Sequence, residues 1–117
     1  MTRTPATFRD LARRLQEAEG PSTSLDVELY KAFRLLNEYA AFPAYTGSID
    51  AAATLMPLEW EVTVIGPCGG AKRWFCRATL IDGNDEWEFA PALTEPLARC
   101  AAACLVEAWR LEHAPNA

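Results

Sequence analysis

Cys100, Cys104 and His113 are the residues of this 117-residue chain that first suggest a metal site. Cys100 and Cys104 are about one helical turn apart, so their thiols would share a helix face. His113 lies further on, in the tail, and the spacing typical of zinc ligands is absent. The same separation argues against a cysteine–histidine catalytic pair. We therefore predict no metal and no cofactor, with Cys76, Cys100 and Cys104 as small core side chains and Cys68 as the exposed thiol.

Acidic side chains alternate with apolar ones along the predicted strands. Paired carboxylates can serve acid–base hydrolysis, but such a row is more often a solvated sheet face neutralised by arginines. We predict that the second strand is central, with arginines that face glutamates on both neighbouring strands. The candidate interaction face consists of Glu59, Glu61, Glu86, Glu88, Arg73 and Arg77.

A polar turn before a short helix is the candidate ligand site. Free N–H groups at the start of a helix can bind an anion, and the turn offers Tyr45, Thr46, Ser48 and Asp50. The alternative is that Ser48 and Asp50 cap the helix while Tyr45 packs over the joint. No nucleotide-binding glycine motif accompanies the turn.

Hydrophobic periodicity and capping residues predict the elements that hold these side chains. Thr4, Ser48 and Thr94 are expected to cap helices, and Thr23 with Asp26 resembles a capping box. Pro57 should end the third helix. The predicted helices are 5–19, 25–39, 49–56 and 95–112, and the predicted strands are 59–65, 73–81 and 86–89, with a hairpin turn at 82–85.

The order of these elements indicates a single α+β domain over residues 1–117. Its N-terminal half is helical, a three-stranded antiparallel β-meander follows, and a C-terminal helix packs on the sheet. Alternation predicts that Trp60, Val62 and Val64 face this helix. One buried stripe is expected along the helix: Leu97, Cys100, Ala101, Cys104, Leu105, Ala108 and Leu111.

Composition and charge narrow the range of functions. Half of the residues are hydrophobic and 23% are charged, which is typical of a globular chain. The net charge is −5, and no basic stripe could follow a phosphate backbone, so we do not expect nucleic-acid binding. No apolar run reaches membrane-spanning length, and no secretory segment begins the chain. These features predict a cytoplasmic protein with no membrane partner.

Three segments resemble the phage ABA sandwich domain proteins. They are the turn and short helix 43–57 that lead into the first strand, the alanine-rich segment 97–105 after Ala90-Pro-Ala-Leu, and the N-terminal helices from Leu11. The resemblance implies a small phage or prophage accessory protein acting in the host cytoplasm. It brings no established activity and no functional residues.

Together these features predict a protein without enzymatic activity. The first hypothesis is non-catalytic binding of a protein with a basic surface, such as a host defence or regulatory component. The alternatives are a binder that sequesters a small ligand such as a nucleotide signal, and a purely structural phage domain. A homo-oligomer is compatible with each hypothesis.

Overall fold

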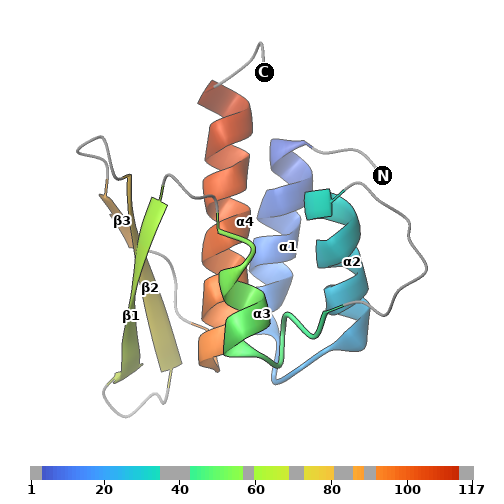
Figure 1. Ribbon diagram of the computed structural model, residues 1–117, viewed down its shortest axis with the longest axis vertical. Coiled ribbons are helices and arrows are strands. Elements are labelled where there is room, and N and C mark those ends of the chain that lie inside the picture. The colour runs from blue at the N-terminus through green and yellow to red at the C-terminus, as the bar shows by residue number, and fades with distance from the viewer. Residues whose placement is uncertain are drawn as a thin grey trace.

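In the computed structural model, the helices lie on one side of an antiparallel sheet (Figure 1). The structure describes residues 4–34, 43–56, 60–68, 73–80, 86–88 and 92–113. Pro57, Glu59, the 82–85 turn and the predicted end of the second helix lie outside these ranges. The elements are α1 (Pro5–Glu17), α2 (Thr23–Arg34), α3 (Ile49–Ala53), β1 (Trp60–Cys68), β2 (Arg73–Leu80), β3 (Glu86–Glu88) and α4 (Glu95–His113).

The sheet has the order β1-β2-β3, with β1 and β2 forming its long antiparallel ladder. Val62 lies opposite Ala78, and Val64 lies opposite Cys76. The three-residue β3 pairs antiparallel with β2, and an isolated bridge joins Trp74 to Ala92. The α+β class, the antiparallel sheet and the closing helix packed on it are therefore confirmed.

Three helix starts are capped as predicted. The hydroxyl of Thr4 accepts a hydrogen bond from the N–H of Thr7 at 3.1 Å, and Pro5 occupies the first turn. The hydroxyl of Ser48 accepts from Ala51 at 3.2 Å. Thr94 accepts from the N–H of Leu97 at 3.4 Å. Each cap satisfies an N–H that the helix leaves unpaired, and this local rule can be applied to sequence alone.

The predicted capping box at the start of α2 is wrong. Ser22, not Thr23, caps this helix: its hydroxyl accepts from the N–H of Leu25 at 3.2 Å, and its carbonyl accepts from Asp26 at 3.0 Å. The carboxylate of Asp26 is therefore not needed at the helix start. It instead binds Thr46, which is distant in sequence.

Helix α4 is the centre of the fold. It packs against α1 and α3 and also against β2, so helices and sheet meet around it (Figure 1). The prediction of one buried stripe is therefore too narrow. Leu105 and Leu111 are only partly buried, while the following residues outside the predicted stripe are buried: Ala98, Ala102, Ala103, Val106 and Glu107. Alanine and cysteine predominate because close neighbours on several sides leave room only for small side chains.

Candidate functional site

The turn predicted as a ligand site points inward. Tyr45 and Thr46 are completely buried, Ser48 is half-buried, and Asp50 is exposed. The carbonyl of Tyr45 accepts a hydrogen bond from the thiol of Cys100 on α4 at 3.3 Å. The hydroxyl of Ser48 is used as the cap of α3. The structure therefore does not bring the four side chains together at a surface.

Thr46 and Asp26 form a buried polar contact that the sequence did not reveal. The carboxylate Oδ1 of Asp26 accepts from the backbone N–H of Thr46 and from its hydroxyl, each at 2.8 Å. The same hydroxyl oxygen accepts from the N–H of Ser22 at 2.7 Å. This network ties the turn before α3 to the start of α2, so its role in the structure is positioning.

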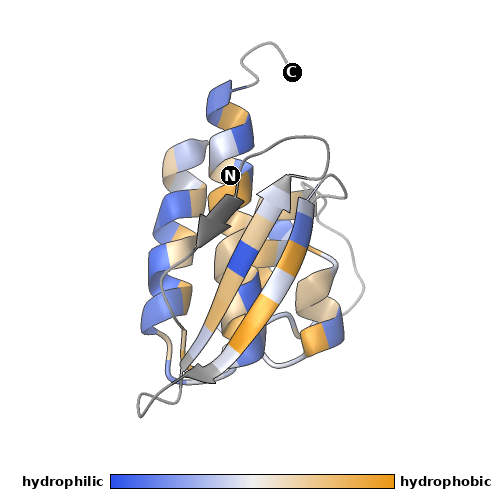
Figure 2. Ribbon diagram, turned by 90° about the vertical axis from the view of Figure 1, so that its left-hand side faces the viewer, coloured by the Kyte–Doolittle hydropathy of each residue, from blue (hydrophilic) through white to orange (hydrophobic). Residues whose placement is uncertain are grey.

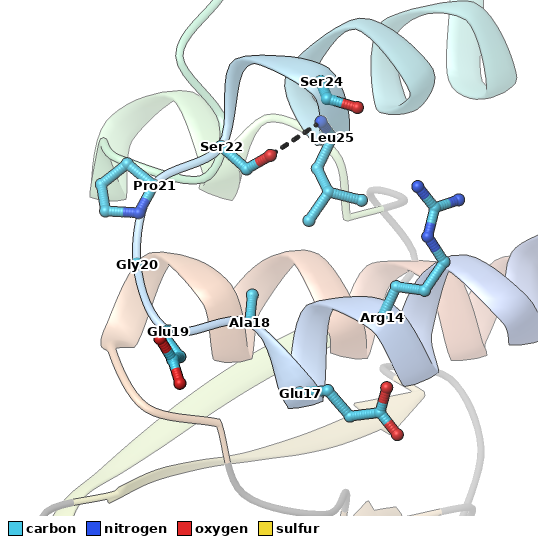
Figure 3. Close-up of a pocket in the computed structure, with 9 residues that line it drawn as sticks. All are labelled: Arg14, Glu17, Ala18, Glu19, Gly20, Pro21, Ser22, Ser24 and Leu25. Carbon is cyan, nitrogen blue, oxygen red and sulfur yellow. Dashed lines mark hydrogen bonds between the residues drawn. The ribbon is translucent and has the colours of Figure 1, made fainter.

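An open hollow of about 480 Å³ lies where α1 turns into α2. Figure 3 shows Arg14, Glu17 and Glu19 at this hollow, with the hydroxyl of Ser22 bound to the N–H of Leu25. The guanidinium of Arg14 is shared between Glu28, at 2.5 and 2.8 Å, and Asp10. This hollow is poorly suited to an anionic ligand, because Arg14 is already paired and Glu17 and Glu19 add negative charge to the lining.

The outer face of the sheet carries alternate side chains of β1 and β2, which are exposed or partly buried. In Figure 2 this face is turned to the viewer and no helix crosses it. Along β1, Glu61, Thr63 and Ile65 are exposed, and Ile65 retains 38% of its accessible surface. Along β2, the residues at the matching register positions are partly buried: Phe75, Arg77 and Thr79.

Register fixes how the predicted charged residues meet. Arg77 lies between Thr63 on β1 and Glu88 on β3. Glu61 and Glu86 both lie opposite Thr79. The register therefore places a glutamate directly opposite Arg77 on the β3 side but not on the β1 side. Alternation alone could not reveal this, because register depends on how the connecting turn aligns the strands.

The remaining position of the candidate face is Arg73. It lies opposite Cys68, beyond an irregularity in the β1–β2 register that begins after Ile65. It is therefore separated from the Arg77 row. The sequence placed Phe75 and Thr63 beside these charges but did not single them out, and Ile65 was missed although it continues the same alternation.

The cysteines are structural where their side chains are described. Cys76, Cys100 and Cys104 are buried free thiols. Burial raises the pKa of Cys76 to about 11 and raises the pKa of Cys100 and Cys104 as well. These thiols thus stay protonated, unlike a reactive thiolate.

His113 packs against the preceding turn of α4. Its ring stacks on Trp109 with centroids 4.4 Å apart, and its Nδ1 lies 2.9 Å from the Trp109 carbonyl oxygen. Within the ranges that the structure describes, no group of three or more His, Cys, Asp or Glu residues is placed to hold a metal ion.

The arginines of α1 and α4 are paired with acids. Arg13 contacts Asp10 at 2.7 Å and Glu17 at 3.1 Å, and Arg99 contacts Glu95 at 3.0 Å. Arg9 pairs with Glu112, which joins α1 to the end of α4. These pairs neutralise the arginines of α1 and α4, which makes the surface of these two helices less attractive to a polyanion.

No family model, no curated protein and no solved structure matches the chain. Among the helices of the described ranges, none combines the length and the apolar character needed to cross a membrane.

Proposed function

We propose that this protein acts without catalysis, by binding a protein partner through the outer face of its sheet. The observation that carries the proposal is that no described helix crosses this face (Figure 2), where the strand register sets an apolar pair beside charged residues. Ile65 and Phe75 lie opposite each other in the register, next to Thr63 and Arg77. An exposed apolar group with a charged surround is typical of a protein contact.

Charge at this face indicates the chemistry of the partner. Two adjacent register rows, Glu61–Thr79–Glu86 and Thr63–Arg77–Glu88, contain three glutamates and one arginine in sequence, which makes a formal net charge of −2. A partner with lysines or arginines around a small apolar contact would complement this pattern. The chain as a whole also has a net charge of −5, which would favour encounter with a basic surface.

The resemblance to phage ABA sandwich domain proteins supports a phage or prophage accessory role in the host cytoplasm. In that setting, a host defence or regulatory component with a basic patch is the partner class that we propose. The ligand-sequestering alternative has less support, because Tyr45 and Thr46 are buried and hydrogen-bonded or packed internally. A structural role in the phage would use the same sheet face with a phage protein.

A comparison of three baits tests the proposal. Wild type, Glu61→Lys with Glu88→Lys, and the control Glu19→Lys with Asp50→Lys are each used for quantitative pull-down from host lysate. Both double variants change the net charge equally, and the control changes exposed acids away from the sheet face. We expect a stoichiometric protein with wild type and control that is lost with the sheet variant. Equal recovery by all three folded baits would refute the proposed contact.

A further inference from the structure

Strand β1 forms an edge of the sheet. Its only strand neighbour among the described residues is β2, and α4 packs beneath it. The regular part of the strand, residues 60–65, contains no lysine and no proline. Edge strands usually carry such features because an unprotected edge offers its backbone groups to another strand.

The backbone groups that face outward can be identified from the bridge at Trp74. Trp74 and Ala92 exchange two hydrogen bonds, of 2.8 and 3.0 Å, on the side of β2 away from β1. Because backbone direction alternates along a strand, Phe75, Arg77 and Thr79 turn their N–H and C=O groups toward β1. Their register partners on β1 are the odd-numbered residues. Val62 and Val64 therefore turn their N–H and C=O groups to the edge on which no described strand lies.

Two inward-facing valines of β1 are less buried than their partners on β2. Val62 and Val64 are only partly buried, whereas Cys76 and Ala78, their partners on β2, are 1% and 0% exposed. Figures 1 and 2 both place α3 in the helix layer on the β1 side of the sheet, beyond the strand edge. Ile49 of α3 is 44% exposed. A further strand beside β1 would lie over this helix and cover apolar surface on both elements.

We infer that β1 of a second copy of this chain occupies the edge, so that two sheets join through an antiparallel β1–β1 pair. The sequence of the edge is self-complementary about a two-fold axis. With Val62 opposite Val62, or with Val62 opposite Val64, valines meet on the inner face and Glu61 never faces its own copy. Both arrangements keep inward residues opposite inward residues, as a shared helix layer requires. Foreign strands could use the same hydrogen bonds, but only the chain itself supplies this symmetric match.

Proline at position 64 tests the pairing. Val64→Pro removes an edge-facing N–H and no N–H of the β1–β2 ladder, and proline is tolerated on an edge strand for this reason. Val64→Thr is the control, since it keeps the N–H and the branched shape. In sedimentation equilibrium we expect two-chain mass for wild type and control, and one-chain mass for Val64→Pro. A two-chain mass that persists in a folded Val64→Pro variant would overturn the inference.

Amide hydrogen exchange of the wild type tests the same inference without a variant. We expect the amides of Val62 and Val64 to be protected at high protein concentration and to exchange rapidly after dilution. The amide of Thr63, which faces β2, should stay protected throughout. One-chain mass at all concentrations, with rapid exchange at Val62 and Val64, would overturn the β1–β1 pair. Neither measurement involves the partner of the outer sheet face, so the two proposals fail independently.

Discussion

Asp26 and Thr46 are joined by two buried hydrogen bonds of 2.8 Å, one from the threonine N–H and one from its hydroxyl. Together they attach the turn before α3 to the first turn of α2. The polar residues that first suggested a binding turn thus stabilise the fold. The proposed function instead uses the outer sheet face, where Glu61 and Ile65 are exposed.

Thr46→Val should destabilise the protein by about 1–3 kcal/mol, because the N–H of Ser22 and the carboxylate of Asp26 would each lose a buried partner. Tyr45→Phe is the matched comparison. The hydroxyl of Tyr45 is buried and has no hydrogen-bond partner in the described part of the chain, so its removal should cost little. Urea denaturation of both variants measures the difference. Equal free energies of unfolding would contradict the assigned role of Thr46.

Stability should fall in acid partly through Glu28. The hydrogen bond from Arg14 holds the pKa of Glu28 below its ordinary value of 4.5. A lowered folded-state pKa means that the stabilisation is present above 4.5 and is lost as the pH falls through the folded-state pKa. The difference in unfolding free energy between wild type and Glu28→Gln should therefore shrink toward low pH. A difference that stays constant from neutral pH to strong acid would exclude this contribution.

Gly66→Ala should be destabilising by about 1–3 kcal/mol through overpacking. A Cβ at this position would lie 2.9 Å from Cε3 of Trp74 and 3.0 Å from its Cα, where the β1 register becomes irregular. Gly20→Ala is the control, because a Cβ there meets no atom within 4 Å. Thermal unfolding should show a lower Tm for Gly66→Ala alone. Similar Tm values for the two variants would argue against the close approach of Trp74.

A larger side chain at a buried position of α4 should also lower the free energy of unfolding. Ala102 is completely buried within α4, and Ala102→Leu should reduce stability by about 1–3 kcal/mol because the larger side chain must displace its neighbours. Ala6 is exposed on α1, so Ala6→Leu is the matched control. Chemical denaturation measures both changes. If Ala102→Leu were as stable as Ala6→Leu, α4 would not be tightly enclosed.

Local rules explain which parts of the fold could be predicted from sequence. Caps such as Thr4 and Ser48 act within three residues, and strand alternation assigned Trp60 to the inner side. The Asp26–Thr46 contact joins residues twenty positions apart, and no local pattern encodes such a pairing.

The burial of α4 and the β1–β2 register depend on contacts between elements that are distant in sequence. Periodicity predicts one buried face for a helix, yet α4 is enclosed on several sides, and its many small residues were the available signal. Likewise, alternation assigned Arg77 to the outer face but could not identify Thr63 as its β1 partner, because the register is set by the chain between the strands.

The affinity of the purified partner for single charge variants tests the proposed function most directly. Calorimetry would compare wild type, Glu61→Lys and the control Glu19→Lys, both variants with equal change in net charge. The proposed contact predicts that Glu61→Lys weakens binding by at least about tenfold, or ~1.4 kcal/mol, while Glu19→Lys binds nearly as wild type does. Unchanged affinity for Glu61→Lys together with weaker binding by Glu19→Lys would contradict it.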